Sequence, residues 1–316
     1  MRTSHITVLT VQINYAVRLD KYLRIEYGSI QQSNIEKAIR KGDILVNSHK
    51  THSAYRVQNG DEITIYRLNS LVSIIAPSTV QNVRFCDNVV GLANKMLDQW
   101  RVYEDDNLIA INKPTKIPTQ GGSKVLISID HAIAYINYIN NYSHFDLWRL
   151  VHRLDKDTSG VLMIAKNLTA AQKIAHGFKM HDITKTYYAV VSGHPPKDRG
   201  VIDSYIASKD SKGQMQVQAN NSVTHYQLIT KLRGIENGVD WQGSLIAFRP
   251  KTGRNHQIRI HAASIDCPIV GDRKYGGREE KYMLLHAKEL TIPSSLLGNE
   301  IELSAPLPFY FNKFLN

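Results

Sequence analysis

The polar stretch from Leu150 to Gly160 contains the residues of this chain that are best suited to chemistry. It reads Leu-Val-His-Arg-Leu-Asp-Lys-Asp-Thr-Ser-Gly and runs directly into the apolar residues 161–165. A brief apolar run between Gly160 and Lys166 predicts a buried strand. The polar side chains would then lie on a loop held by rigid structure, where catalytic and binding groups are often found.

Asp155 could act as a nucleophile, because an ionised carboxylate can attack a substrate and a neighbouring cation favours the ionised form. A single Asp in a loop is more often a cap or turn residue, so its type alone assigns no role. Asp157 follows two residues later and would lie on the same side of an extended chain, about 6.6 Å away. Inverting glycosidases hold two carboxylates ~6.5–9.5 Å apart, so a glycoside hydrolase is one interpretation of this pair.

The elements that position this loop come from a chain of 316 residues, which is enough for about two domains. The chain has 39 Lys and Arg against 28 Asp and Glu, a net charge of +11. Such an excess favours a polyanionic partner, because cations that neutralise phosphates release counterions. A solvated basic surface would have the same composition, so charge alone leaves both interpretations open.

The spacing of the cysteines and histidines argues against a disulfide-bonded or metal-binding protein. Cys86 and Cys267 are the only cysteines and are far apart, so we expect no disulfide framework and a reducing compartment. His256 and His261 are five residues apart, which suits neither a helical pair nor a same-face strand pair, so no metal is expected. With no apolar run near ~18 residues and no secretory pattern, we expect a cytoplasmic protein without a membrane partner.

The chain divides by pattern into three parts. In residues 14–70 a helical pattern ends at Gly42, as helices often do, and short strands follow at 44–47 and 62–66. Residues 71–100 are a predicted linker whose end, 89–100, has a helical pattern. Residues 101–316 mix strands with helices. This order favours α+β or mixed α/β packing over a strict strand–helix–strand array.

Four segments, taken in order, resemble RNA pseudouridine synthases of the RluA/RluC/RluD family, the branch that modifies large ribosomal RNA. The loop motif His-Arg-Leu-Asp-x-x-Thr-Ser-Gly is one, and Thr-Gly-Arg-x-His-Gln-Ile-Arg is another. The segments are 103–114, 150–160, 185–187 and 250–261, and the match extends through 271–276 and 284–287. Together these blocks are highly specific.

This resemblance implies a catalytic domain built on a mixed, mainly antiparallel sheet with flanking helices. It also implies isomerisation of uridine to pseudouridine in bacterial 23S ribosomal RNA. The reaction cuts the N1–C1′ bond, turns the base and joins C5 to C1′, without net redox change. We therefore expect no cofactor. The partner would be large-subunit ribosomal RNA or a pre-ribosomal particle, and the enzyme would be a monomer.

The resemblance further implies roles for single residues. Asp155 would be the catalytic residue, with Arg259 paired to it. Arg153 would fill the space left by a flipped uridine, although an ion pair with Asp157 is a structural alternative. Tyr187 would stack on the uracil, at about 1–3 kcal/mol for one base on one aromatic ring, unless it is a core aromatic of a strand.

Two further residues are expected to contact RNA, and one residue departs from the family. Arg254 lies in a basic segment that suits an RNA backbone, and His152 would orient the loop or contact RNA. Two residues after Asn112-Lys113-Pro114 the family often has Gly, whereas this chain has Lys116. The turn at that position is therefore expected to differ.

The N-terminal part resembles the small RNA-binding domain named after ribosomal protein S4. The likeness rests on residues 18–23 and 41–47. Basic residues of two helices would face phosphates, or form a solvated surface: Arg18, Lys21, Arg24, Lys37, Arg40 and Lys41. A non-catalytic RNA-binding or ribosome-assembly factor is the second interpretation of the whole chain, but it gives the Asp155 loop no purpose.

Overall fold

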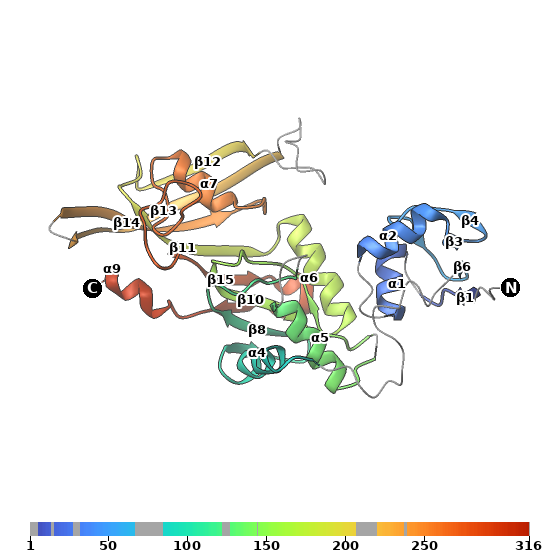
Figure 1. Ribbon diagram of the computed structural model, residues 1–316. Helices are drawn as coiled ribbons and strands as arrows, with labels where there is room; N and C mark the ends of the chain where they lie inside the picture. Colours follow the sequence, from blue (N-terminus) through green and yellow to red (C-terminus); the bar gives the residue numbers. More distant parts are fainter. Residues whose placement is uncertain are drawn as a thin grey trace. The chain divides into compact units, whose positions relative to one another are not determined.

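The computed structural model describes residues 6–13, 16–27, 32–66, 85–121, 127–143, 145–206, 220–236 and 239–315. The chain separates into two compact units, residues 1–84 and 85–316 (Figure 1). Both boundaries differ from the predicted ones. Strand β1 (Ile6–Thr10) pairs with β6 (Glu62–Tyr66), so the first unit begins before residue 14. Helix α4 (Asp87–Asp98), predicted at the end of a linker, buries its apolar side in the core of the second unit.

The first unit is a small antiparallel sheet with two helices. Its other elements are β2 (Val17–Arg18), α1 (Leu19–Tyr27), α2 (Gln32–Lys41), β3 (Ile44–Val46), β4 (His49–Lys50) and β5 (Arg56–Val57). The sheet order is β1-β6-β3-β4, and β2 pairs with β5. The apolar pattern predicted for α2 is confirmed, because Ile35, Ala38 and Ile39 are buried. Gly42 ends this helix with a φ of 78°, a conformation that glycine adopts readily.

The second unit is organised by a ten-stranded sheet. Its strands are β7 (Arg101–Glu104), β8 (Leu108–Lys113), β9 (Arg149–Leu150), β10 (Ser159–Ala165), β11 (Thr184–Ser192), β12 (Arg199–Ile206), β13 (Asn220–Glu236), β14 (Val239–Pro250), β15 (Leu285–Ile292) and β16 (Ile301–Ser304). The order is β12-β13-β14-β11-β15-β10-β8-β7, with β16 beside β15 and β9 beside β10. Among the described strands only β10 and β15 run parallel. The predicted α+β class, with a mixed and mainly antiparallel sheet, is confirmed.

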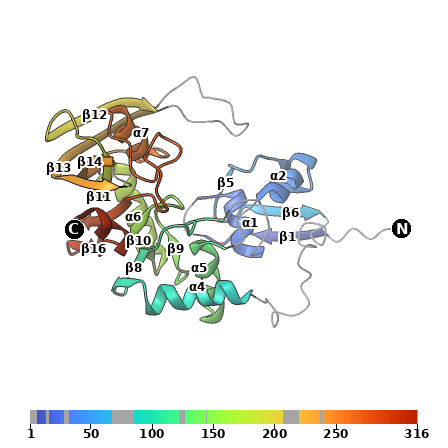
Figure 2. The same ribbon diagram turned by 60° about the vertical axis from the view of Figure 1, so that its left-hand side comes forward.

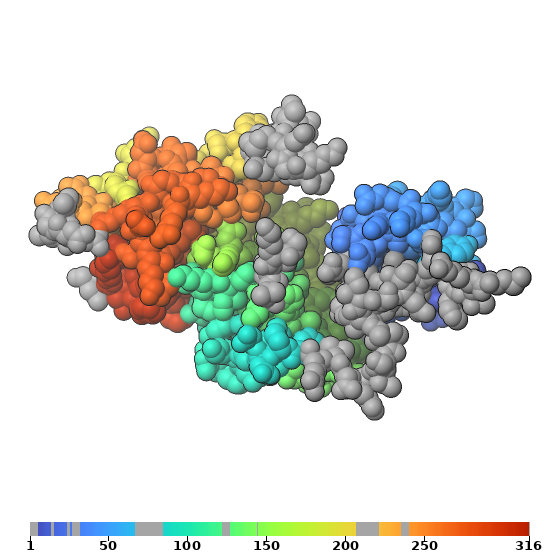
Figure 3. Space-filling view, viewed as in Figure 1, coloured from blue at the N-terminus to red at the C-terminus, as the bar shows by residue number. Residues whose placement is uncertain are grey.

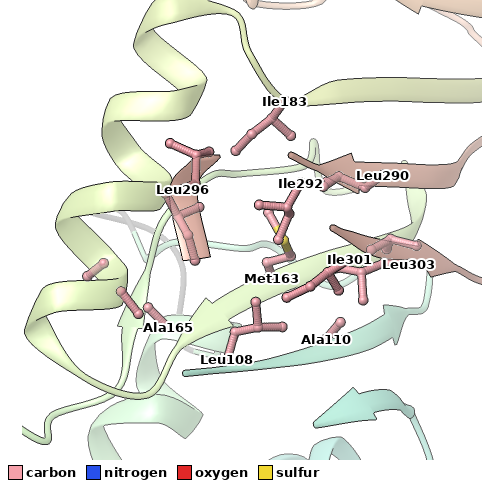
Figure 4. Packing of buried hydrophobic residues seen from close by; sticks show 14 of the residues in the cluster. Leu108, Ala110, Met163, Ala165, Ile183, Leu290, Ile292, Leu296, Ile301 and Leu303 are labelled. Atoms are coloured by element: carbon pink, nitrogen blue, oxygen red, sulfur yellow. The ribbon is translucent and has the colours of Figure 1, made fainter. Parts of the chain in front are cut away.

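Helices pack against several parts of this sheet. They are α4, α5 (Ile129–Ile139), α6 (Leu168–Met180), α7 (Gln257–Ser264) and α8 (Ser294–Leu297), followed by a 3-10 turn, η1 (Phe309–Phe311), and α9 (Asn312–Leu315). Figure 2 shows α4 and α5 together on one side of β8 and β10. The other side is closed by α6, α8 and β16 (Figure 4). No helix of the described segments is long and apolar enough to cross a membrane.

Strand β10 is buried throughout and anchors the loop that precedes it. Its side chains alternate between faces, as a strand requires: Val161 and Met163 pack in the α6 cluster, and Leu162 and Ile164 in the α4–α5 cluster. Gly160 starts the strand with a φ of 110°, and a Cβ there would lie 2.2 Å from the carbonyl oxygen of Ala287. Only glycine allows this close parallel pairing, which fixes where the loop 152–159 enters the sheet.

Candidate active site

A cleft of 890 Å³ in the second unit collects the residues that the motifs predicted. Its walls come from the loop before β10, the end of α6, the start of β11 and the segment between β14 and α7. Five Lys and Arg side chains line it: Arg153, Lys179, Lys185, Arg254 and Arg259. Asp155 is the one carboxylate among the lining residues. The cleft is thus positively charged around a single acid.

The backbone of the Asp155 loop is held by threonine side chains from the β8–α5 connection. Thr119 Oγ1 accepts from the backbone nitrogen of Leu154 (3.1 Å) and donates to its carbonyl oxygen (2.7 Å). Thr115 Oγ1 donates to the carbonyl oxygen of Asp157 (2.8 Å). These bonds satisfy loop groups that would otherwise be unpaired, so the backbone is fixed on either side of Asp155.

Lys113 supports the same loop and was not among the residues predicted from the sequence. Its side chain is fully buried, and Nζ donates to the carbonyl oxygens of Pro114 and Ile117 (both 2.9 Å) and of Lys156 (3.4 Å). Burial lowers the pKa of Lys113 to about 7, opposed by the charges of Asp157 and Asp155. A lysine at the end of an apolar strand was the available signal, because buried lysines need partners.

The Asp155 carboxylate faces two nitrogen groups and stays partly open to the cleft. Its Oδ2 atom lies 3.7 Å from Arg259 Nη1 and 3.7 Å from His256 Nε2. The Asp155 side chain is 22% exposed. Arg259 therefore forms an ion pair with Asp155, as the motif comparison implied, but at a distance longer than a hydrogen bond.

Arg259 is held in place by a second carboxylate. Its Nε and Nη2 atoms donate to Asp272 Oδ2 and Oδ1, both at 2.7 Å, and the Asp272 side chain is fully buried. The guanidinium lies over the Tyr275 ring, 5.1 Å from its centroid. Burial works against the charged form, but the hydrogen bonds and charge of Asp272, with Asp155, raise the pKa of Arg259. The Nη1 group is thereby left to face Asp155.

His256 is the second nitrogen group beside Asp155. Its Nδ1 atom lies 3.0 Å from Tyr275 Oη and 3.4 Å from Lys274 Nζ. Burial lowers the pKa of His256, although the charge of Asp155 opposes this, and Arg259 and Lys274 lower it further. A neutral ring that accepts from these donors at Nδ1 carries its proton on Nε2, the atom that faces Asp155.

Tyr187 lines the cleft from β11, beside an irregularity in the pairing of β11 with β15. Burial raises the pKa of its hydroxyl, and the charge of Asp155 adds to this, so it stays protonated. Tyr188 packs in a different core cluster, with Val190 and Leu232, whereas Tyr187 packs with residues of two others. The two rings therefore lie on opposite faces of β11, as the alternation of side chains along a strand requires.

His152 is fixed to the fold by its own ring. Its Nε2 atom accepts from the backbone nitrogen of Met163 (2.8 Å), and the ring stacks on Phe178 at 4.9 Å. Burial, with the charge of Lys185, lowers its pKa to about 3. His152 therefore orients the start of the loop as a neutral ring, one of the two roles expected for it.

Arg153 and Arg254 present cations to the cleft in different ways. Arg153 is exposed and forms no ion pair with Asp157 or with any other residue that the structure describes. The Nε atom of Arg254 donates to the carbonyl oxygen of Asn221 (3.3 Å). Its backbone nitrogen donates to the buried amide of Gln257 (2.9 Å), which holds the turn before α7. Both residues line the cleft.

The basic residues expected to contact RNA in the first unit lie on or beside α1 and α2. The exposed ones are Arg18, Lys21, Lys37, Arg40 and Lys41. Arg18 donates to the buried carboxylate of Asp20 at 2.7 Å. The side chain of Arg24 lies outside the described residues. The cleft lining comes from the second unit alone.

Comparison with known proteins finds similarity to enzymes of one class. The family model described as RNA pseudouridylate synthase matches residues 107–264. A ribosomal large subunit pseudouridine synthase C from Rickettsia typhi is 42% identical, covering 98% of this chain and 99% of that protein. The protein of that name from Vibrio cholerae serotype O1 is 28% identical, covering 94% of this chain and 92% of that protein.

A solved structure is also similar. Human RNA pseudouridylate synthase domain containing 4 has a TM-score of 0.58 and 26% identity, covering 71% of this chain and 94% of that one. The matched residues 107–264 include the Asp155 loop, Tyr187 and Arg259. The family predicted from the motifs is confirmed: this chain belongs to the RNA pseudouridylate synthases.

Proposed function

We propose that this enzyme converts specific uridines of bacterial large-subunit (23S) ribosomal RNA to pseudouridine, with Asp155 as the nucleophile. The relatives that are 28% to 42% identical over nearly the whole chain are named as large-subunit synthases. The observation that carries the proposal is the lone carboxylate in a cleft lined by five Lys and Arg side chains. That charge arrangement suits a polyanionic backbone with one reacting group at its centre.

The isomerisation requires one carboxylate, with a positively charged group beside it. Cleavage of the N1–C1′ bond, rotation of the base and C5–C1′ bond formation leave the redox state unchanged. A carboxylate can form the covalent bond that keeps base and sugar together, by attack on either of them. Asp155 has Arg259 Nη1 and His256 Nε2 at 3.7 Å, so the Arg259 cation places positive charge beside the carboxylate that would attack.

The base must leave its stack before Asp155 can reach it. Arg153 is exposed at the cleft and has no ion-pair partner among the described residues, so its planar guanidinium is available to fill the vacated space. Tyr187, which stays protonated, offers a ring on which the uracil can stack. Arg254, Lys179 and Lys185 would contact the phosphates.

The first unit would add affinity outside the cleft. We infer that it is an S4-like RNA-binding domain, because its exposed basic residues lie on or beside two short helices, α1 and α2. The first unit, residues 1–84, would form this domain, and the second unit, residues 85–316, would form the catalytic domain. The partner would be ribosomal RNA or a pre-ribosomal particle, bound by a monomeric enzyme.

The test is a pseudouridine map of ribosomal RNA. Cells that lack the gene would be complemented with wild type, Asp155→Asn or Asp157→Asn, and carbodiimide-modified sites would be read by primer extension. Wild type and the Asp157 control should restore the same sites, because the Asp157 side chain is exposed and outside the cleft lining. Asp155→Asn should restore none while still binding RNA. An rRNA map that is unchanged by loss of the gene would refute the proposal, and RNA binding would then favour an assembly factor.

A further inference from the structure

Lys116 occupies a backbone conformation that lysine rarely adopts. Its φ is 68°, in the left-handed region that costs a non-glycine residue roughly 1–2 kcal/mol. The strained residue is not part of the cleft lining, so the proposed reaction does not account for it. Strain of this kind points to a role for the side chain.

The Lys116 ammonium rests on a group of aromatic rings at the surface. Its Nζ atom is 4.7 Å from the centroid of the Tyr282 ring, and Lys281 Nζ is 5.3 Å from the same centroid. Tyr282 stacks on Tyr310 at 4.6 Å. Phe309 meets both rings edge-on, at 6.1 and 5.6 Å. We call these five residues the aromatic–basic surface.

Phe309 is the open ring of the aromatic–basic surface. It is 73% exposed, whereas its neighbour Phe311 is fully buried in a core cluster. Most of the Phe309 ring is therefore open to solvent. Exposed aromatic rings beside cations are typical of sites that bind single-stranded nucleic acid, because any base can stack on them.

The two lysines of the surface have no acidic partner among the residues that the structure describes. Neither Lys116 nor Lys281 forms an ion pair with a residue that the structure describes. The adjacent carboxylate, of Glu280, is engaged by Lys313 at 2.7 Å and by the backbone nitrogen of Lys281 at 2.9 Å. Two ammonium groups over one ring repel each other, and an anion such as a phosphate group would relieve that repulsion.

The surface is joined to the catalytic loop but lies outside the cleft. Tyr310 Oη donates to Ser159 Oγ (3.0 Å), and Thr115, next to Lys116, donates to the Asp157 carbonyl oxygen. Four residues of extended chain, from Asp155 to Ser159, span at most about 14 Å. In Figure 3 the orange segment lies at the surface, with the red C-terminal segment on one side and turquoise residues on the other. RNA leaving the cleft could therefore reach this surface.

We propose that the aromatic–basic surface is a second RNA contact, which binds an unpaired nucleotide of the substrate near the target uridine. Phe309 stacks on the base, and Lys116 and Lys281 contact its phosphates. The site rests on the proposed function for its substrate, but it is separate from the residues that perform the chemistry. Its contribution is to affinity and to the choice of RNA, because it makes the same contacts before and during the reaction.

The first experiment measures binding of in vitro transcribed, deproteinised large-subunit ribosomal RNA over a range of salt concentrations. Phe309→Leu keeps an apolar side chain but removes the ring, and should weaken binding at least about fivefold, the lower end of stacking one base. Phe309→Trp should bind like wild type. Lys116→Ala with Lys281→Ala should reduce the slope of log Kd against log salt by about 0.7 for each phosphate that the lysines no longer neutralise.

Matched controls separate this site from general charge and folding effects. Lys95→Ala with Lys173→Ala removes two exposed lysines from α4 and α6 and lowers the net charge equally; its salt slope should match that of wild type. In activity assays the surface variants should raise KM and leave kcat unchanged. Wild-type affinity and salt slope in both surface variants would overturn the inference.

A cross-linking experiment needs no variant at all. Irradiation of wild-type enzyme bound to thiouridine-substituted large-subunit RNA should leave a nucleotide on the peptide that contains Phe309. An adduct found only on peptides of the cleft would reject the second contact. A wild-type enzyme that makes no pseudouridine would instead refute the proposed function. The binding data would still test whether the aromatic–basic surface binds RNA.

Discussion

Replacing Asp272 with Asn should cost the enzyme both stability and activity, because this carboxylate holds the cation that faces Asp155. The Asp272 side chain is fully buried and the Arg259 side chain is 10% exposed, so solvent screens their interaction little. An Asn keeps the shape of the site but can accept only one of the two 2.7 Å hydrogen bonds from Arg259. The guanidinium would keep its charge without its balancing partner.

The size of the effect follows from that burial. Breaking a buried ion pair by removing one partner costs about 3–5 kcal/mol. In a unit the size of residues 85–316, each kcal/mol lowers Tm by roughly 2–4 °C, so a drop of roughly 6–20 °C is expected. Calorimetry or thermal circular dichroism measures it. Glu279→Gln is the matched control, since the Arg273–Glu279 pair has side chains 73% and 84% exposed and should leave Tm unchanged.

A double variant separates stability from catalysis. Arg259→Met with Asp272→Leu replaces the buried pair by apolar groups of similar volume, which is often neutral for stability. This variant should restore most of the decrease in Tm yet make no pseudouridine, because the Arg259 cation beside Asp155 is gone. Full activity in the double variant, or a Tm for Asp272→Asn equal to that of the Glu279 control, would refute the assigned role of Asp272.

Two further predictions concern acid stability and the turn at residue 116. Burial lowers the pKa of His152 to about 3 and of His286 to about 4, whereas both protonate near ~6.5 in the unfolded chain. The unfolded state therefore binds more protons below pH 6.5. The free energy of unfolding should fall by up to about 1.4 kcal/mol per pH unit for each ring as the pH is lowered, until the pKa of that ring in the folded state is reached. Denaturant titrations at pH 7 and 5 would measure this decrease, which should be smaller in His286→Gln. Lys116→Gly should be more stable than Lys116→Ala by about 1 kcal/mol, because both variants lack the ammonium group but only the Ala variant keeps the strain at φ 68°. An Ala variant more stable than the Gly variant would show that the turn relaxes.

The residues that contact substrate in the proposed reaction could be predicted from the sequence, because they belong to motifs that follow one another in a fixed order. Asp155, Arg259 and Tyr187 are separated along the chain, and the matching blocks alone predicted that they meet; the structure places all three in one cleft. The strand β10 could be predicted from its composition and borders, since residues 161–165 form a continuous apolar run between Gly160 and Lys166. The reaction class could thus be inferred before the fold.

The supporting residues could not be predicted in the same way. Lys113, Thr119 and Asp272 each act on a group between 13 and 43 residues away along the chain, and no local pattern specifies such a partner. The domain boundaries failed for a related reason. Helix α4 has the composition of an ordinary amphipathic helix, and only its tertiary packing of Leu92 and Met96 assigns it to the second unit.

The geometry around Arg259 explains how a charged partner can assist Asp155, the proposed nucleophile, without restraining it. A hydrogen bond of 2.7 Å from Arg259 to Asp155 would have to break before the carboxylate attacked, and would add its cost to the barrier. Instead Asp272 takes both short hydrogen bonds, and Asp155 receives the same positive charge at 3.7 Å. The electrostatic attraction between two charges weakens slowly with distance, whereas a hydrogen bond weakens steeply. The buried carboxylate of Asp272 therefore keeps Arg259 charged and in place, and leaves the oxygen atoms of Asp155 free to move toward the substrate.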